Sequence, residues 1–323
     1  MKYPVFFLIF LLIGCSKPES RPAAQYQHAA NSSYAAALSD DGRFAVVSST
    51  EHQVAFWDVD NNALQFQWRH QPDADNLVFA LAISHNNSHV LTADQQTFAL
   101  WRTSDGQNNG FWQVDDSTIR DIALSDNGAH LLVGKSSGAV QHITLSTGRR
   151  LEFLAHTERI NSVAMSPNGH YALTGANDYM AYLWDTRTAR IIYSFSHPSR
   201  VTKVALDPTG RYAFTADSQD LAQIWDIQTG QLVSKLHIIA HQQIFSAVRF
   251  SPDGNQLATG SPSRKLELWD VQSGKRLQQW WVSPRFRSRP PSAVIHDVAF
   301  LDGHRLISES SSGKAEVWEI KND

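Results

Sequence analysis

The chain of 323 residues contains a single cysteine, Cys15, so it can form no intramolecular disulfide and must be stabilised by its packed core. Its longest apolar run, residues 5–13, has nine residues, well short of the ~20 that a helix needs to cross a bilayer. Positive charge is not in excess, because 28 lysines and arginines are set against 31 aspartates and glutamates. This balance argues against a protein that binds nucleic-acid phosphates.

Familiar catalytic motifs are also absent. The chain has 14 histidines but no HExxH, no CxxCH, no glycine-rich phosphate loop and no GxSxG elbow. Acid–base pairs assembled from separate segments stay open. We therefore expect no enzymatic activity, no catalytic residue, no cofactor and no metal site.

The surroundings of Cys15 suggest why one thiol is retained. Lys2 precedes the apolar run and small Gly14 follows it, which is the order of a secretory signal. Leu12-Ile13-Gly14-Cys15 resembles the lipobox of bacterial lipoproteins, in which the signal is cut before the cysteine and lipid is attached to that residue. The resemblance implies removal of residues 1–14 and lipid attachment at Cys15. An ordinary signal peptide with an incidental cysteine is the alternative.

The next segment, residues 15–24, has two prolines, mixed charge and no apolar periodicity, so we interpret it as a lipidated tether. Its extended reach is roughly 30 Å. In lipoproteins an aspartate after the cysteine favours the inner membrane, so Ser16 implies the outer membrane with the body facing the periplasm. Display outside the cell stays open.

Residues 25–323 repeat a pattern of alternating apolar runs separated by polar turns, each repeat predicting a four-stranded antiparallel meander. Tryptophans near the end of the third run mark the repeats, and His142 fills one vacant slot. Successive markers are 44, 41, 42, 41, 44 and 49 residues apart, which predicts seven units. The markers are Trp57, Trp101, His142, Trp184, Trp225, Trp269 and Trp318.

These repeats, with Trp-Asp at the end of several third runs, resemble the WD40 family. The resemblance implies an all-β, seven-bladed β-propeller. The last unit stops after its third run, and residues 23–30 precede the first unit without a place in it. We therefore predict that this segment closes the ring as the outer strand of the seventh blade, which removes an exposed sheet edge.

The family resemblance also implies a structural hydrogen-bond network in the fourth unit, formed by His156, Thr174, Asp178 and Trp184. It recurs as internal satisfaction of buried polar groups, which favours a structural over a catalytic role. The fifth and sixth units keep the histidine and threonine, as His197 with Thr215 and His241 with Thr259. Gln219 and Ser263 stand where we expect the aspartate, so these units are predicted to be less rigid there.

Two sets of residues are candidates for partner binding. The first is the ring just after the apolar start of each innermost strand, which in WD40 proteins lies near the narrow channel mouth. It comprises Tyr34, Phe79, Arg120, Asn161, Thr202, Ser246 and His296. The second is the cationic segment that contains Arg285, Phe286, Arg287 and Arg289. Arginine and aromatic residues are enriched at protein interfaces; unconstrained surface is the alternative for the ring and a solvated insertion for the segment.

We therefore expect a non-catalytic, lipid-anchored protein-interaction platform in the bacterial cell envelope. Its partner would be another envelope protein, and it would contact the membrane through the N-terminal lipid. We do not expect it to bind nucleic acid. The alternative is an envelope enzyme or sensor with a small-molecule or metal site in the propeller channel. The ring contains one histidine and no carboxylate, which favours the platform.

Overall fold

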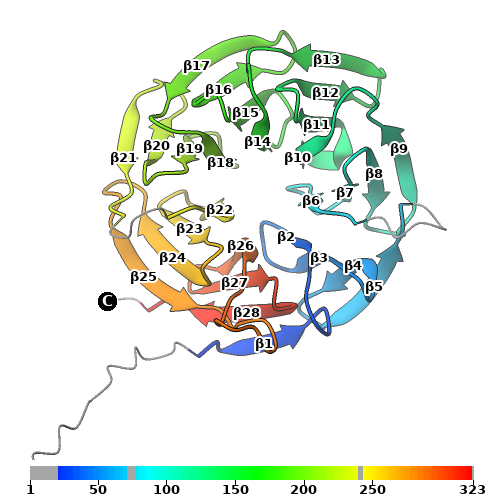
Figure 1. Ribbon diagram of the computed structural model, residues 1–323, viewed down its shortest axis with the longest axis vertical. Helices are drawn as coiled ribbons and strands as arrows, with labels where there is room; N and C mark the ends of the chain where they lie inside the picture. Colours follow the sequence, from blue (N-terminus) through cyan, green and yellow to red (C-terminus); the bar gives the residue numbers. More distant parts are fainter. Residues whose placement is uncertain (1–20, 71–76, 239–242, 322–323) are drawn as a thin grey trace, which may run out of the picture.

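The computed structural model describes residues 21–70, 77–238 and 243–321, which form seven four-stranded antiparallel sheets around a central channel (Figure 1). The predicted all-β, seven-bladed propeller is thereby confirmed. The described residues include one short turn of 3-10 helix, Asp126–Gly128.

Blades 1 to 6 each use four consecutive strands, ordered from the channel outward (Figure 1). Blades 1 to 3 consist of β2 (Ala35–Leu38), β3 (Phe44–Ser49), β4 (Gln53–Asp58), β5 (Ala63–Trp68); β6 (Ala80–Ile83), β7 (His89–Ala93), β8 (Thr97–Arg102), β9 (Asn108–Gln113); and β10 (Ile119–Leu124), β11 (His130–Lys135), β12 (Val140–Thr144), β13 (Arg149–Phe153). Blades 4 to 6 consist of β14 (Ile160–Met165), β15 (Tyr171–Ala176), β16 (Met180–Asp185), β17 (Arg190–Ser196); β18 (Val201–Leu206), β19 (Tyr212–Asp217), β20 (Ala222–Asp226), β21 (Leu232–Lys235); and β22 (Ala247–Phe250), β23 (Gln256–Gly260), β24 (Lys265–Asp270), β25 (Arg276–Trp281).

Blade 7 joins the two ends of the chain. It contains β26 (Ile295–Asp302), β27 (Arg305–Ser310) and β28 (Lys314–Glu319), and its outer strand is β1 (Ala24–Gln27). Ala24 pairs with Val317 and Tyr26 with Ala315. The predicted closing strand is confirmed. It begins at Ala24, the last residue that we assigned to the tether. The ring therefore has no free strand edge at its junction.

The core lies between the blades. Buried apolar side chains of the described residues form seven clusters, each of which spans two adjacent blades. In one of them Phe214 and Ile224 of blade 5 belong with Phe245 and Phe250 of blade 6. Because each blade buries its faces against two neighbours, no blade completes its core alone.

Close packing between blades requires a small residue on the second strand. A Cβ on Gly175 would lie 2.5 Å from Cγ1 of Val201 in the next blade, which is closer than Cβ contacts allow.

The junction between blades 7 and 1 differs, because Glu309 occupies the position of Gly175 and Ser33 stands where other blades have a larger apolar residue. Glu309 contacts the buried ring of His28, so this junction is held by polar contacts.

Candidate functional site

The seven mouth-ring residues lie where the innermost strands begin. In blades 3, 4, 5 and 7 the pairing of the first two strands skips one residue, and the skipped residue is Arg120, Asn161, Thr202 or His296. A β-bulge of this kind leaves its extra residue unpaired and re-aims the side chain. In these four blades the ring residue is therefore free of the ladder, whereas the backbone amides of Tyr34, Phe79 and Ser246 donate to the second strand of their own blades.

The structure brings five of the seven together. Tyr34, Phe79, Arg120, Ser246 and His296 line one pocket of about 210 Å³. The other two are held by neighbouring groups: Asn161 Nδ2 donates to Asn177 Oδ1 and to the Val201 carbonyl, both at 2.8 Å, and Thr202 Oγ1 donates to the Ala216 carbonyl at 3.3 Å.

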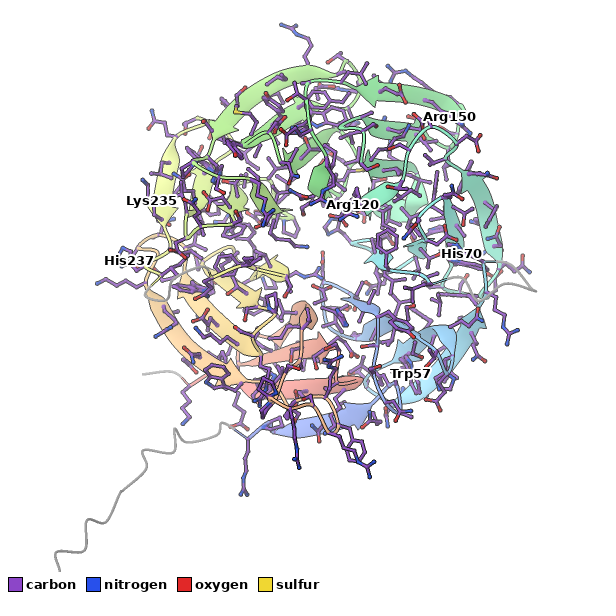
Figure 2. All side chains as sticks on the ribbon, in the orientation of Figure 1. Trp57, His70, Arg120, Arg150, Lys235 and His237 are labelled. Carbon is purple, nitrogen blue, oxygen red and sulfur yellow. The ribbon has the colours of Figure 1, made fainter. Side chains whose placement is uncertain are left out.

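The residues that line the mouth pocket differ in their exposure and in whether their side chains are already hydrogen-bonded. Tyr34 is 43% exposed, and Arg120 is exposed at the edge of the central opening (Figure 2). Ser246 Oγ donates to the Ile295 carbonyl at 2.7 Å, and His296 Nε2 lies 3.2 Å from the Ser33 carbonyl oxygen. Tyr34 and Arg120 are therefore the members most available to a partner, whereas Phe79 is half-buried against the core between blades 2 and 3.

The mouth is cationic, and sequence reasoning missed part of that charge. Lys203 also lines the pocket, and Arg159 stands next to the start of β14. Burial lowers the pKa of Arg120, and the charge of Arg159 lowers it further. Within the described part of the chain, the side chains of these three cations have neither a hydrogen-bond nor an ion-pair partner.

One carboxylate also reaches the pocket. Asp121 accepts hydrogen bonds from the backbone amides of Val163 and Ile122, at 2.8 and 3.0 Å. Burial raises its pKa, which the charge of Lys203 opposes. One of its oxygens thus joins blade 3 to blade 4 and the other bonds within blade 3, while its charge also acts on Arg120 and Lys203.

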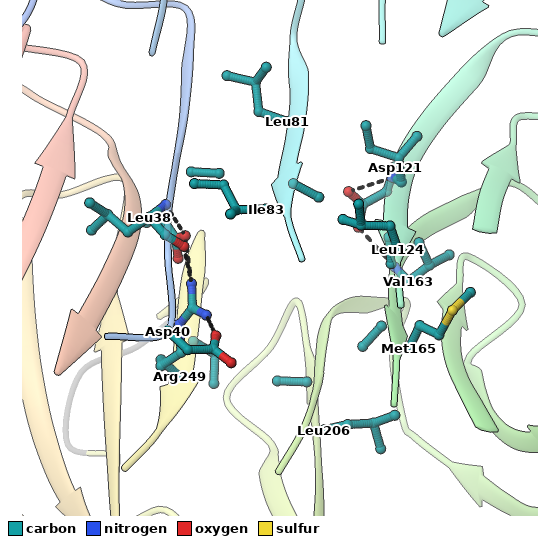
Figure 3. Close-up of a pocket in the computed structure, with 18 of the residues that line it drawn as sticks. Leu38, Asp40, Leu81, Ile83, Asp121, Leu124, Val163, Met165, Leu206 and Arg249 are labelled. Atoms are coloured by element: carbon teal, nitrogen blue, oxygen red, sulfur yellow. Dashed lines mark hydrogen bonds and ion pairs between the residues drawn. The ribbon is translucent and has the colours of Figure 1, made fainter. Parts of the chain in front are cut away.

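Arg249 lines a second cavity of the central channel, of about 200 Å³, which shares Asp121, Lys203 and His296 with the mouth pocket (Figure 3). Arg249 occupies a strand position that is alanine in the other six blades. Its Nη2 lies 2.8 Å from Asp297 Oδ2 and donates to the Leu38 carbonyl at 3.0 Å, and its Nη1 contacts Asp40. The alanines are Ala37, Ala82, Ala123, Ala164, Ala205 and Ala299.

Asp40 extends this network to His85, whose Nδ1 lies 2.5 Å from Asp40 Oδ2. Burial would raise the pKa of Asp40, but the charge of Arg249 and the contact with His85 lower it to about 2. Burial opposes protonation of His85, and its hydrogen bond to Asp40 nevertheless raises its pKa. The channel thus contains carboxylates that the ring alone did not indicate, and Asp40 and Asp297 are engaged by Arg249.

The histidine network of blade 4 has the expected core. His156 Nε2 lies 2.9 Å from Thr174 Oγ1, and His156 Nδ1 lies 2.9 Å from Asp178 Oδ2. Trp184 departs from the expectation, because within the described residues its Nε1 has no partner. Its ring instead stacks on Phe153 with centroids 4.4 Å apart. Burial lowers the pKa of His156, and Asp178 opposes that shift.

Blade 5 contains a carboxylate near its histidine that the repeat alignment did not indicate. His197 Nε2 lies 2.8 Å from Thr215 Oγ1, and its Nδ1 lies 3.4 Å from Asp217, two residues before Gln219. Position 219 carries no aspartate, as the sequence indicated, but the carboxylate of Asp217 at the end of β19 lies close to the same imidazole. His241 lies outside the described residues, and in its blade Trp269 Nε1 donates to Thr259 Oγ1 at 2.9 Å.

A further network was missed in blade 2. His70 Nε2 lies 2.6 Å from Thr92 Oγ1, its Nδ1 lies 3.6 Å from Asp94, and Trp101 Nε1 donates to the same threonine at 2.9 Å. The segment between His70 and β6 is longer than the segment between His156 and β14. A search at the histidine-to-strand spacing of blade 4 therefore did not find His70. A search for a histidine directly after the outer strand would have found it.

His142, which fills the vacant tryptophan slot, is buried and stacks on His130 with centroids 5.2 Å apart. Within the described residues neither ring nitrogen has a hydrogen-bond partner. Burial and the charges of His130 and Arg149 lower its pKa to about 4. The imidazole is therefore neutral near pH 7 and serves as a packing group.

The second candidate set, the cationic segment, lies apart from the mouth pocket, between β25 and β26. Arg285, Arg287 and Arg289 are exposed and Phe286 is 74% exposed. Trp280, just before the segment, is buried in the core between blades 6 and 7. The geometry thus separates a core tryptophan from an exposed cationic loop.

The remaining expectations concern metals and the membrane. Among the residues that the structure describes, no group of three or more histidine, cysteine, aspartate or glutamate side chains is arranged to hold a metal ion. Likewise, no helix within those residues is long and apolar enough to cross a membrane. Cys15 and the lipobox lie outside the described residues.

Comparison with known proteins supports the repeat assignment. The WD40 model, described as WD domain, G-beta repeat, matches residues 148–185, 189–226 and 230–270. Each match begins near the outer strand of one blade and continues through three strands of the next, so the sequence repeat is offset from the blade. No curated protein matches the chain. WD40 propellers are typically non-catalytic scaffolds, and the coarse function that these repeats indicate is that of a protein-interaction scaffold.

Proposed function

We propose that this protein is a non-catalytic, lipid-anchored platform of the bacterial cell envelope that binds a protein partner at the channel mouth. The observation that carries the proposal is the set of unpaired cations beside exposed Tyr34 and half-buried Phe79. Arg120 and Lys203 lie in one pocket with Tyr34 and Phe79, on a chain whose formal charge is -3. Arginine and aromatic side chains are the usual anchors of protein interfaces.

The rigid scaffold supports the same conclusion. The ring residues are placed by strands whose blades pack tightly on both sides, so they present a preformed surface. Preformed surfaces lose little conformational entropy on binding. Because the cations at the mouth are unpaired, the complementary partner carries carboxylates there.

The anchor and location are part of the proposal. The lipobox-like Leu12-Ile13-Gly14-Cys15 supports lipid attachment at Cys15, and Ser16 supports the outer membrane with the propeller facing the periplasm. Several acyl chains would make the attachment firm, at about 0.8 kcal/mol for each buried methylene. Mass spectrometry of the N-terminal peptide from membranes tests this step, and an unmodified Cys15 would disprove it.

Crosslinking followed by affinity purification from membranes tests the binding face. The native protein is compared with a variant carrying Tyr34→Ala, Phe79→Ala and Arg120→Ala, and with a matched control carrying Arg190→Ala on the outer strand β17. We expect a specific envelope protein that the first variant loses and the control retains. Recovery of no protein, or equal recovery by both variants, would contradict the mouth as the binding face.

The alternative function, a small-molecule or metal site in the channel, has one observation in its favour. Asp40, Asp121 and His85 line a cavity of about 200 Å³. Asp40 and His85 contact each other, and Asp121 accepts two backbone amides, which leaves less capacity for a ligand. If no protein partner is recovered, calorimetric titration with metal ions and small anions becomes the deciding experiment.

A further inference from the structure

The arginine loop, residues 283–292 between β25 and β26, is closed by its own hydrogen bonds. The Arg285 amide donates to the Ser292 carbonyl at 3.0 Å, and the Ser288 amide donates to the Arg285 carbonyl at 3.1 Å. The Ser292 amide donates to Ser288 Oγ at 3.0 Å. A loop held in this way keeps its cations in place with little further loss of conformational freedom.

The cations of the arginine loop have no acidic partner within the described residues. Arg285 Nη2 reaches only Ser292 Oγ, at 3.4 Å, and Arg289 makes no side-chain contact of this kind. The guanidinium of Arg287 lies over the ring of Phe286, 4.9 Å from its centroid. Phe286 is 74% exposed, more than any other large apolar side chain among the described residues.

The position of the loop relates it to the N-terminal segment. Gln25 of β1 donates to Ser283 Oγ at 3.1 Å, so the loop lies beside the outer strand that closes blade 7, at the rim of the disc (Figure 1). Cys15 is six residues before Arg21, the first described residue. Six residues span at most about 20 Å, so a lipid on Cys15 would keep this part of the rim close to the bilayer.

We propose that the arginine loop binds the phosphate groups of anionic phospholipids, with Phe286 entering the boundary between headgroups and acyl chains. The inference rests on the lipid anchor of the proposed function. An acyl anchor combined with a basic, aromatic surface segment is an effective two-part membrane attachment. The propeller then stands on the rim of blade 7, and the channel mouth stays open to a partner beside it.

A single-label fluorescence experiment tests this contact in the full-length, lipidated protein. Phe286→Cys introduces a thiol at an exposed position. It is the one thiol that can be labelled, because Cys15 carries the lipid. An apolar, environment-sensitive dye is attached to it and takes the place of the phenylalanine ring. The matched control is Leu154→Cys. Leu154 is also apolar and is 69% exposed, but it lies between β13 and β14, in the connection from blade 3 to blade 4. Both are reconstituted in phosphatidylcholine vesicles with and without phosphatidylglycerol.

We expect a blue shift at position 286 that requires phosphatidylglycerol, weakens at high salt and does not occur at position 154. Adding Arg285→Gln, Arg287→Gln and Arg289→Gln should remove it, because each arginine contributes about fivefold to binding at an anionic surface. No shift in anionic vesicles, or an unchanged shift in the triple variant, would overturn the proposal. A shift produced by a soluble acidic protein but not by vesicles would overturn it as well.

Failure of the anchor is measured separately. If mass spectrometry finds Cys15 unmodified, the proposed lipid attachment fails, and the unlipidated protein is sedimented with the same anionic vesicles. Binding at least tenfold weaker in the triple variant than in the native protein would still support the loop. Equal sedimentation of the two would overturn it. Circular dichroism of the triple variant confirms that it is folded in either case.

Discussion

The guanidinium of Arg249 lies 2.8 Å from the carboxylate of Asp297 in the neighbouring blade, inside a channel lined at the same level by alanines. The same guanidinium contacts Asp40 of blade 1, on the far side of the junction where the two ends of the chain meet. A single side chain therefore connects blades 6, 7 and 1. Charged contacts of this kind are costly to break singly, because the partners remain partly buried without a counter-charge.

We expect Arg249→Ala to lower the free energy of unfolding by about 2 kcal/mol, since it leaves Asp40 and Asp297 without their shared cation. Urea denaturation followed by tryptophan fluorescence measures the change. Arg190→Ala, an exposed arginine on β17, is the control and should change stability by less than ~0.5 kcal/mol. Equal effects of the two substitutions would show that the channel network contributes no stability.

His142 makes stability depend on pH. The unfolded chain takes up a proton near the ordinary histidine pKa of 6.5, whereas in the folded protein the pKa of His142 is lowered to about 4. Protons therefore favour the unfolded state between these values, and the free energy of unfolding falls as the pH drops from 6.5 to 4. The full effect is about 3 kcal/mol, at 1.36 kcal/mol for each pKa unit.

The variant His142→Phe keeps an aromatic ring in this slot and removes the titrating group. Its stability should vary less with pH than that of the native protein between pH 6.5 and 4, when both are measured by urea denaturation at several pH values. Parallel curves for the two proteins would mean that other histidines cause the dependence.

A comparison of two buried tryptophans distinguishes the contribution of an indole hydrogen bond to stability from the contribution of packing. Trp318 Nε1 donates to Ser308 Oγ at 2.9 Å, whereas Trp184 Nε1 has no partner among the described residues. Both rings are at most 1% exposed. Trp318→Phe should therefore cost about 1 kcal/mol more than Trp184→Phe, because it leaves a buried serine hydroxyl without its donor. Thermal denaturation of both variants provides the comparison, and a larger loss in Trp184→Phe would contradict it.

Close blade packing predicts the effect of one methyl group. Gly175→Ala would place a Cβ 2.5 Å from Val201 Cγ1, so we expect a loss of about 1–3 kcal/mol from overpacking. Gly303→Ala is the matched control, because nothing lies within 4 Å of a Cβ built there. Differential scanning calorimetry should show a lower Tm for Gly175→Ala alone. If Gly175→Ala matches the native Tm, the interface is less tightly packed than its contacts indicate.

Much of this molecule could be read from its repeats. Seven tryptophan or histidine markers at intervals near 40 residues predicted seven blades, and an incomplete last unit together with an unassigned N-terminal segment predicted how the ring closes. These features are local and periodic, since each blade needs the same alternation of apolar residues and turns. The positions at the channel mouth followed from the same alignment, because every innermost strand begins in the same place.

The charge arrangement could not be predicted in the same way. Arg249 belongs to a strand of ordinary alternation, and its partners Asp40 and Asp297 are more than 200 and nearly 50 residues away in the sequence. Asp217, at the end of β19, lies close to the imidazole of His197, although the repeat alignment pointed only to position 219, which is glutamine. The sequence by itself determined the number, order and closure of the blades. Only the tertiary structure decided which charges are paired in the channel and which remain free at its mouth and on the arginine loop, because the folded ring alone sets the distances between residues of different blades.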